Sequence, residues 1–326
     1  MEKLDLKDRK ILYELDIDSR QSFSQLGKKV GLHKDVVSYR VKKLLEKGII
    51  KNFYTEINSY KLGYSQVKFY LTFQNITPEI KQEIIDYLVK NPYTEIVSSF
   101  EGSYDLGVLS YVENIPKFYN IWKDIINKYK DFFSNQIFCV ANTNNEYKKT
   151  LLLDEKTDEK DNRIIFIENS SVNKVEIDSL DKKILELLNQ NSRISTLDIA
   201  KNLNSTVNTI NLRIKKLVKT GIILRFSIGI DWPKIGYQWY KADIFLKDSK
   251  KMQQIIDYIK INPYFFCLLV SLGYVDMELL FILNNVNQLH QIMGDLSSKF
   301  PNTIRNYKYG SVTKIHKYEV VDFWNR

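Results

Sequence analysis

The stretch LDLKDRKILYELDIDSRQS, residues 4–22, returns as IDSLDKKILELLNQNSRIS, residues 177–195, and this repeated text decides the fold. The correspondence runs without a gap from residue 4 to residue 64, at an offset of 173, with 22 identities in 61 positions. The repeat units of solenoid proteins are only about 20–50 residues long, so a copy of this length indicates a duplicated domain. One chain therefore carries two versions of the same unit.

Each copy is patterned as three helices with a tight turn before the third. Apolar residues of the second copy recur over 177–188 with the 3.6-residue period of an amphipathic helix. Asp5 and Asp178 precede this first helix in their copies, where a short acceptor binds the free N–H groups of the first turn. We expect Ser22 and Ser195 to cap a second, shorter helix in the same way.

Residues that tolerate the left-handed conformation are placed to end the second and third helices. They are Gly31, Asn204, Gly48 and Gly221. The order of helix, short helix, tight turn and longer helix is that of a helix-turn-helix. The stretches 49–54 and 222–226 then predict a short β segment, which makes the motif winged, and from which Lys51 or Arg225 could touch backbone phosphate.

In a helix-turn-helix, the N-terminal part of the third helix enters the DNA major groove. The outward positions there are His33, Lys34, Asp35, Ser38, Tyr39 and Arg40 in the first copy, and Thr206, Val207, Asn208, Thr209, Asn211 and Arg213 in the second. Arginine pairs bidentately with guanine, and asparagine pairs with adenine. Lysines that would contact phosphate follow in the same helices: Lys42, Lys43, Lys215 and Lys216. The alternative is that these cations form only the solvated face of an amphipathic helix.

Positive charge is confined to the two repeated segments. Residues 1–62 hold 14 Lys or Arg against 9 Asp or Glu, and residues 177–235 hold 10 against 5, so each segment carries +5. The whole chain carries +9, so the remainder sums to −1. Basic charge restricted to particular modules is the electrostatic footprint of nucleic-acid binding, which makes double-stranded DNA the expected partner.

Each repeated head is followed by a unit with the order β-α-β-β-α-β, which is the ferredoxin-like arrangement. Its predicted elements in the first half are a half-buried strand over 67–73, a helix over 80–88, strands over 94–100 and 106–109, a helix over 115–129 and a strand over 136–141. The Asn-Pro-Tyr and Gly-x-x-Asp motifs of this unit return at an offset of 171. We therefore expect the second unit to be two residues shorter, in or near its first helix.

The predicted fold class is α+β, with two winged helix-turn-helix domains alternating with two ferredoxin-like βαββαβ domains. The expected ranges are a first head at 1–62, a first ferredoxin-like unit at 63–153, a charged linker at 154–176, a second head at 177–235 and a second unit at 236–326. Residues 154–161 contain no apolar side chain, as is typical of a linker. The apolar run 164–167 predicts one additional strand.

This arrangement resembles the Lrp/AsnC, or feast/famine, transcriptional regulators of bacteria and archaea. The resemblance covers both halves and rests in the first on Leu4-Asp5-x-x-Asp8-x-x-Ile11-Leu12, Ser19-Arg20, Leu26-Gly27-x-x-Val30-Gly31-Leu32, Val37-x-x-Arg40-Val41-x-x-Leu44, Gly48-Ile49-Ile50 and Gly102-x-Tyr104-Asp105-Leu106. It implies a sequence-specific DNA-binding regulator whose ferredoxin-like unit is an effector domain, often called RAM. It also implies that two such units dimerise through their β-sheets.

The resemblance further implies that an amino acid or a related small effector binds near the Gly-x-x-Asp turn. The residues concerned are Gly102, Tyr104, Asp105, Gly273 and Asp276. The alternative for the glycines and aspartates is a plain turn requirement.

The chain departs from the family pattern in two ways. Two subunits are fused, which predicts a covalent pseudo-dimer that can self-associate further. The second copy matches the family pattern less closely than the first. Val275 occupies the position of Tyr104, and the outward residues of the third helix differ between the copies. Half-site symmetry mirrors protein symmetry, so we predict two non-identical half-sites instead of a palindrome.

An enzyme on the same fold is the alternative function, because siroheme decarboxylases resemble this family in both head and tail. Their chemistry calls for His, Arg or Tyr groups that face substrate carboxylates. The chain has only His33, His290 and His316, and we expect the last two on exposed faces. A third hypothesis is a sensor or scaffold that no longer binds DNA.

We expect no enzyme, and no catalytic residue, cofactor or metal, because the sequence has no Ser/His/Asp array, phosphate-cradling glycine loop or metal-ligand spacing. Cys139 and Cys267 are expected to be buried thiols in a reducing cytoplasm. No apolar run approaches the roughly 18–20 residues that span a bilayer, and no signal-peptide stretch follows Met1, so a membrane partner is not expected.

Overall fold

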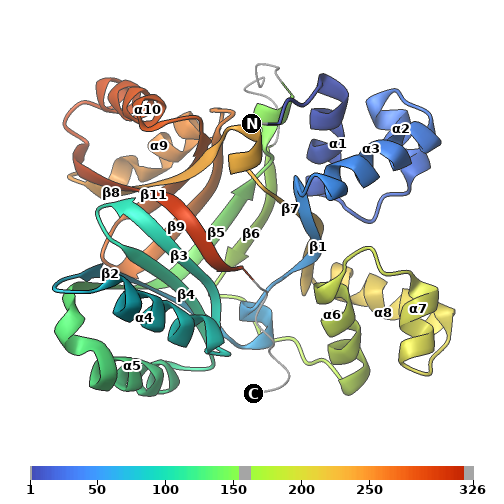
Figure 1. Cartoon of the computed structure of the whole chain (residues 1–326), viewed down its shortest axis with the longest axis horizontal. Helices are drawn as coiled ribbons and strands as arrows, with labels where there is room; N and C mark the ends of the chain where they lie inside the picture. The colour runs from blue at the N-terminus through green and yellow to red at the C-terminus, as the bar shows by residue number, and fades with distance from the viewer. Residues whose placement is uncertain (1, 154–162, 319–326) are drawn as a thin grey trace.

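The computed structural model describes residues 2–153 and 163–318. Two helical heads lie on one side of the molecule and a large sheet with its covering helices lies on the other (Figure 1). The heads consist of α1 (Leu6–Ile17), α2 (Phe23–Val30) and α3 (Lys34–Glu46), and of α6 (Ser179–Gln190), α7 (Thr196–Asn202) and α8 (Val207–Lys219). Within these described residues, no helix is both long enough and apolar enough to cross a membrane.

The helix ends confirm the caps predicted from the sequence. Asp5, Asp178, Ser22 and Ser195 each accept a hydrogen bond from the backbone N–H three residues later. The residues predicted to be left-handed have positive φ angles: Gly31 at 67°, Asn204 at 48°, Gly48 at 64° and Gly221 at 71°. Local sequence chemistry therefore sets the helix ends and turns in both copies.

Both ferredoxin-like units have the predicted order of elements. The first contains β2 (Ser65–Phe73), α4 (Pro78–Lys90), β3 (Thr94–Gly102), β4 (Leu106–Val112), α5 (Ile115–Tyr129) and β5 (Phe133–Tyr147). The second contains β8 (Gln238–Leu246), α9 (Met252–Ile259), β9 (Phe265–Gly273), β10 (Met277–Leu283), α10 (Val286–Lys299) and β11 (Ile304–Tyr318). The first helix is shorter in the second unit, as predicted, with 8 residues against 13, and the 3₁₀ turn Ser249–Lys251 directly precedes it.

The remaining elements lie between these units. They are the strands β1 (Ile50–Ile57), β6 (Ile164–Asn169) and β7 (Ile223–Ile230), and the 3₁₀ turns Tyr60–Leu62, Lys130–Phe132, Thr150–Leu152, Pro233–Ile235 and Ser249–Lys251. Strand β6 is the predicted additional strand, and it pairs with the end of β5. Residues 154–162, the first part of the predicted linker 154–176, lie outside the described residues.

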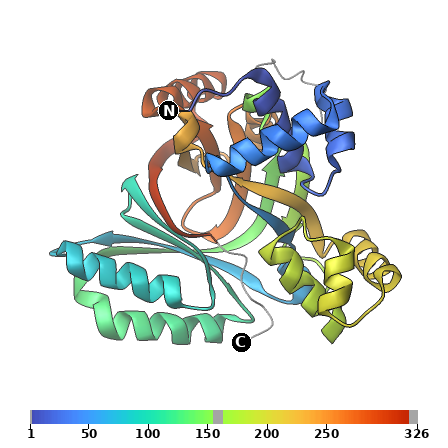
Figure 2. The same cartoon turned by 45° about the vertical axis from the view of Figure 1, so that its right-hand side comes forward.

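The two ferredoxin-like units share one closed sheet. Its strand order is β2-β4-β3-β11-β8-β10-β9-β5, and an additional pairing of β5 with β2 completes the ring. The long strands β5 and β11 make this possible, because each pairs first within its own unit and then with a strand of the other unit. The helices α4 and α5 cover one part of the outer surface, and α9 and α10 cover the other (Figures 1 and 2).

Closure of the sheet corrects the prediction that the strand over 67–73 is half-buried. The apolar positions of β2 face α4 and α5, as the alternation indicates, but the opposite face of this strand lies inside the ring. Gln66 and Lys68 are each 2 % exposed and Tyr70 is 6 % exposed. A period-two pattern identifies the face that meets the helices, but it does not reveal that a second copy covers the other face.

The predicted β segments after the third helices form a ribbon shared by the two heads. Strand β1 pairs antiparallel with β7, so each head contributes one strand to a two-stranded sheet. The prediction that Arg225 touches phosphate is wrong, because its side chain is only 4 % exposed and is paired with Asp16 and Glu146. Lys51 remains half-exposed, and its Nζ lies 3.2 Å from an oxygen of Asp231.

Each head is completed by residues of the opposite half of the chain. The core of the first head includes Ile228, Trp232 and Phe266. The core of the second head includes Ile57 and Leu62. The halves are therefore intertwined, and the chain is a pseudo-dimer in one polypeptide.

Candidate DNA-binding interface

The third helices α3 and α8 bury equivalent residues and expose different ones. Val37, Val41 and Leu44 of α3 are buried, and their equivalents in α8 are buried as well. On the outer face, Tyr39 is 62 % exposed, and the equivalent residue of α8 is Leu212, which is 59 % exposed. The repeat has thus kept the packing face and changed the face that a groove would meet.

The predicted contact residues fall into two groups by exposure. The exposed ones are His33, Lys34, Asp35, Tyr39, Lys42, Lys43, Thr206, Val207, Asn208, Lys215 and Lys216. The half-buried ones are Ser38, Arg40, Thr209, Asn211 and Arg213. The sequence interpretation omitted Leu212, although its match to Tyr39 at the offset of 173 was sufficient to identify it.

Arg40 and Arg213 hold their helices against the first helix of the head. The Nη1 atom of Arg40 donates to carboxylate oxygens of Asp5 and Asp8, each at 2.8 Å. Arg213 makes the equivalent pairs with Asp178 and Asp181. These contacts engage the guanidinium groups for which we predicted guanine pairing, and they fix the tilt of α3 and α8.

The C-terminal end of each third helix is bound by a lysine of the other half. Lys234 Nζ donates to the backbone carbonyl of Lys47, which follows α3, at 2.8 Å. Lys61 makes the equivalent bond to the carbonyl of Thr220, after α8. A cation at a helix C-terminus also interacts favourably with the helix dipole. The lysine of the repeated Lys-x-Gly-Tyr motif therefore binds the end of the third helix of the opposite copy.

The repeated Ser-Arg dipeptide joins the two heads. The hydroxyl groups of Ser19 and Ser192, which are equivalent residues, lie 2.7 Å apart and are buried. Arg20 donates to the backbone carbonyls of Ser192 and Ile194. Arg193 donates in the same way to the backbone carbonyls of Ser19 and Gln21 in the first head. Together with the ribbon β1–β7, these bonds fix the orientation of one reading helix relative to the other.

Comparison with known proteins agrees with this geometry. The family model described as the AsnC-type helix-turn-helix domain matches residues 4–45, and a model described as winged helix-turn-helix DNA-binding matches residues 177–223. An HTH-type transcriptional regulator of Pyrococcus furiosus is 38% identical over 103 residues, which are 32% of this chain and 70% of that protein. The chain belongs to the Lrp/AsnC family of transcriptional regulators. The regulator Ptr1 of Methanocaldococcus jannaschii is 35% identical over 120 residues, which are 35% of this chain and 78% of that protein.

A solved structure matches this Lrp/AsnC protein over both halves. It is the structure of the siroheme decarboxylase NirDL. The alignment covers 98% of this chain and 94% of the NirDL chain, with a TM-score of 0.65 and 12% sequence identity. At this identity the match shows a common fold and nothing further about activity. The fold of the whole chain is thus shared with another protein.

The Gly-x-x-Asp turns of this Lrp/AsnC protein make structural contacts between its halves. A Cβ atom on Gly102, whose φ is +123°, would lie 2.5 Å from the carbonyl oxygen of Tyr309 in the other half. Gly273 meets the carbonyl oxygen of Phe138 in the same way, at 2.6 Å. Only glycine permits this approach. Asp105 and Asp276 each accept a backbone N–H at 2.7 Å. The role of these turns in effector binding stays a prediction.

Charged side chains inside the closed sheet are balanced only across the two halves. Lys68 and Lys241, which are equivalent residues, both pair with Glu278. Lys241 also pairs with Asp243 at 2.5 Å. In the first half, the positions of Asp243 and Glu278 are occupied by Tyr70 and Gly107. Both lysines are therefore neutralised by carboxylates of the second half.

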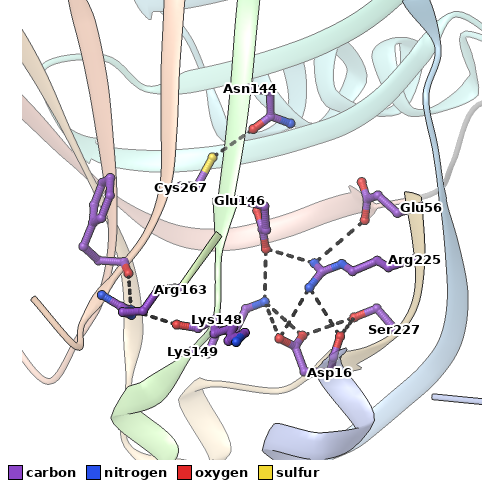
Figure 3. Close-up of polar contacts among 11 residues, drawn as sticks. Asp16, Glu56, Asn144, Glu146, Lys148, Lys149, Arg163, Arg225, Ser227 and Cys267 are labelled. Carbon is purple, nitrogen blue, oxygen red and sulfur yellow. Dashed lines mark hydrogen bonds and ion pairs between the residues drawn. The ribbon is translucent and has the colours of Figure 1, made fainter. Parts of the chain in front are cut away.

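A second buried network ties the first head to the closed sheet (Figure 3). Asp16, at the end of α1, accepts from Lys149 Nζ at 2.9 and 3.0 Å and from the hydroxyl of Ser227 at 3.1 Å. Arg225 of β7 pairs with Asp16 at 3.5 Å and with Glu146 of β5 at 2.9 Å. Burial alone would raise the pKa of Asp16, but Lys149 and Arg225 outweigh it and lower the pKa below its usual value.

This network exists on one side of the pseudo-dimer. The positions equivalent to Asp16, Arg225 and Glu146 carry Asn189, Asn52 and Lys317, which cannot form the same set of ion pairs. The two heads are thus attached to the closed sheet by different chemistry.

Replacing Asp16 by Asn will loosen the first head selectively. The side-chain shape is retained, but two buried cations lose a partner, which costs about 1–3 kcal/mol of folding free energy. Hydrogen exchange should quicken in α1 and leave α6 unchanged. The control variant Asn189→Ala acts at the equivalent site of the second head and should leave α1 exchange unchanged. Equal acceleration in α1 and α6 for Asp16→Asn would refute the one-sided attachment.

Proposed function

We propose that this Lrp/AsnC protein is a transcriptional regulator that reads two non-identical half-sites in double-stranded DNA with one chain. The observation that carries the proposal is the contrast between α3 and α8. Equivalent contacts hold the two helices, while Tyr39 faces outward from one and Leu212 from the other. Half-sites follow the symmetry of the protein, so different reading faces require different sequences.

The fixed relation between the heads gives the half-sites a fixed spacing. The ribbon β1–β7 and the bonds of Arg20 and Arg193 connect the heads directly. Rigid placement of two readers favours DNA in which both half-sites lie in the matching register. The proposed operator is therefore a pair of different sequences at one separation and in one orientation.

The side chains divide into three proposed roles. Exposed residues of the N-terminal parts of α3 and α8 contact bases, with Asn208 a candidate for adenine and Leu212 for the methyl group of thymine. The exposed lysines that follow contact phosphate. Arg40 and Arg213 act as positioning residues, because their guanidinium groups are paired with aspartates of the same head.

An effector remains part of the proposal, since the Lrp/AsnC resemblance implies an amino acid or related molecule near the Gly-x-x-Asp turns. Tyr104 is buried, and its hydroxyl has no hydrogen-bond partner among the described residues. This hydroxyl is one polar group near a turn that a ligand or a shift of the turn would satisfy, and the hydroxyl of Tyr274 in the second turn is another. Assembly of pseudo-dimers into larger particles is proposed on the same family basis.

Decarboxylation of siroheme is the weaker candidate. It rests on the fold shared with NirDL. A substrate with several carboxylates needs cations that are available to it. The buried cations of the described residues are bound by carboxylates or by backbone carbonyls: Lys68, Lys149, Arg163, Arg225 and Lys241. His33 and His290 are exposed, and His316, which we expected on an exposed face, is half-buried against Ser99.

Selection of bound DNA from a random pool tests the proposed function. We expect enrichment of two different short motifs at one spacing. Absence of any enriched motif would reject sequence-specific reading. Enrichment of a single palindrome would reject the asymmetry while retaining DNA binding.

A further inference from the structure

A cavity of about 720 Å³ lies between the ribbon β1–β7 and the closed sheet. Its walls come from both halves of the chain, and they include the ribbon, the end of α1 and strands of the closed sheet. Pockets for small molecules measure about 300–1,000 Å³, so the size suits a ligand. The residues of the Gly-x-x-Asp turns do not line this cavity, so it is separate from the effector site that the resemblance implies.

Three cations of the cavity wall are paired with carboxylates, and a fourth, Lys317, donates to the backbone carbonyl of Asn91 and to the hydroxyl of Thr94. Arg225 and Lys149 belong to the network around Asp16 that Figure 3 shows. Lys51, at the opposite end of the ribbon strand, is paired with Asp231. An anionic ligand would have to break these pairs. The wall also carries Lys314, which is exposed, and His316, which is half-buried.

Two carboxylates of the wall are poorly compensated. Glu56 of β1 lies 4.0 Å from Arg225, at the limit of an ion pair, and that arginine is shared with two other carboxylates. Burial raises the pKa of Glu56 to about 7. Burial, with the nearby charge of Glu56, raises the pKa of Glu95 of β3 well above its usual value. These shifts mean that burial outweighs the nearby positive charge, which comes from Arg225 and Lys149 for Glu56 and from Lys317 for Glu95.

Further features of the wall fit a donor group and an apolar body. Gln66 is 2 % exposed, its Nε2 donates to the hydroxyl of Tyr111, and its Oε1 has no hydrogen-bond partner among the described residues. Trp239, which is the residue equivalent to Gln66, lies 5.6 Å from the ring of Phe266. Its indole N–H also lacks a partner within the described chain. Aromatic faces attract organic cations, and the free indole N–H would donate a hydrogen bond to a hydroxyl oxygen of the same ligand.

We propose that this cavity binds an organic cation, a small amine whose ammonium group is held by Glu56 and Glu95. The apolar part of the amine packs against Trp239 and Phe266. Gln66 Oε1 accepts one of the ammonium hydrogens. The site goes beyond DNA reading, and because residues of β1 and β7 form part of its wall, an occupant touches the ribbon that joins the two heads.

Calorimetric titration of the full chain at pH 8, without DNA, tests the proposal. The probes are tyramine, putrescine and spermidine, with 3-(4-hydroxyphenyl)propionate as the anion that shares the ring of tyramine. We expect at least one amine to bind with a stoichiometry of one and the anion not to bind. No binding by any of the three amines, or equal binding of the anion, would overturn the proposal.

Variants locate the bound amine. Glu95→Gln and Glu56→Gln keep the side-chain shape and remove one charge, and each should weaken amine binding about tenfold or more, as expected when an ammonium group loses a charged partner. The control Glu113→Gln removes an exposed carboxylate outside the cavity and should leave binding unchanged. Unchanged binding in both cavity variants would place the amine elsewhere and overturn the proposal. Because DNA is absent, failure here leaves the proposed function unaffected.

Discussion

Glu278→Ala will destabilise the protein by about 3–5 kcal/mol, because it leaves buried lysines without their shared partner. Glu278 is fully buried and binds Lys68 and Lys241, and the hydroxyl of Tyr70 donates to it at 2.9 Å. Burial alone would raise the pKa of Glu278, but Lys241 and Lys68 outweigh this effect and lower its pKa well below the usual value. Urea unfolding of the variant and the native protein measures the loss.

An exposed ion pair provides the control for this experiment. Glu2 and Lys47 pair at 2.7 Å, but both side chains are nearly half exposed. Such pairs contribute little to stability, so Glu2→Ala should leave the urea midpoint almost unchanged. If Glu278→Ala lowers the midpoint no more than Glu2→Ala does, the charges inside the closed sheet are not what holds the halves together.

The same cluster explains why the two halves differ. Two copies of the first half would bring two lysines together with no carboxylate at these positions. Two copies of the second half would bring two lysines together with four carboxylates, since each would supply Asp243 and Glu278. Only the combination of one first half and one second half places two lysines beside two carboxylates. Buried charges require such balance, so the interior of the closed sheet specifies a heterodimer.

Removing the exposed lysines of α3 and α8 will lower DNA affinity by about a thousandfold or more at 0.1 M salt. The variant replaces Lys42, Lys43, Lys215 and Lys216 by Ala. Each phosphate contact adds about 0.9 to the slope of log affinity against log salt, so four contacts amount to roughly 3.6 powers of ten between 0.1 and 1 M. Gel shift of the selected DNA at several salt concentrations measures both the affinity and the slope.

A matched charge change elsewhere distinguishes contact from general electrostatics. The control replaces four exposed lysines of the ferredoxin-like units by Ala: Lys90, Lys123, Lys250 and Lys299. Net charge falls by the same amount, but the slope should change little because these residues belong to the ferredoxin-like units and not to α3 or α8. Equal losses in the two variants would show that α3 and α8 do not contact the DNA backbone.

Local structure could be predicted from the sequence because it depends on neighbouring residues. The caps at Asp5 and Ser22, the left-handed Gly31 and the order of the ferredoxin-like elements all follow from short-range chemistry. The additional strand β6 was visible as an apolar run. The duplicated fold and the membership of the Lrp/AsnC family were therefore open to prediction.

Contacts between the copies could not be predicted by periodicity. The ring closes between strands far apart in the chain, so Lys68 became buried although its strand alternates like a surface strand. Arg225 was interpreted as exposed for the same reason, since its partner Asp16 lies in the other half. Arg40 has the residue type of a base reader, and only the fold shows the aspartates beside it. The repeated Ser19-Arg20 pair was a usable signal, because identities at positions without core periodicity indicate an interface.

Selection from a random DNA pool, on the native chain and on a head-matching variant, tests the central claim most directly. The variant gives α8 the outward residues of α3 through Thr206→His, Val207→Lys, Asn208→Asp, Thr209→Val, Asn211→Ser and Leu212→Tyr. The account predicts two different half-sites at one spacing for the native chain and an inverted repeat of the first half-site for the variant. A palindrome selected by the native chain, or the same motif selected by both proteins, would contradict it.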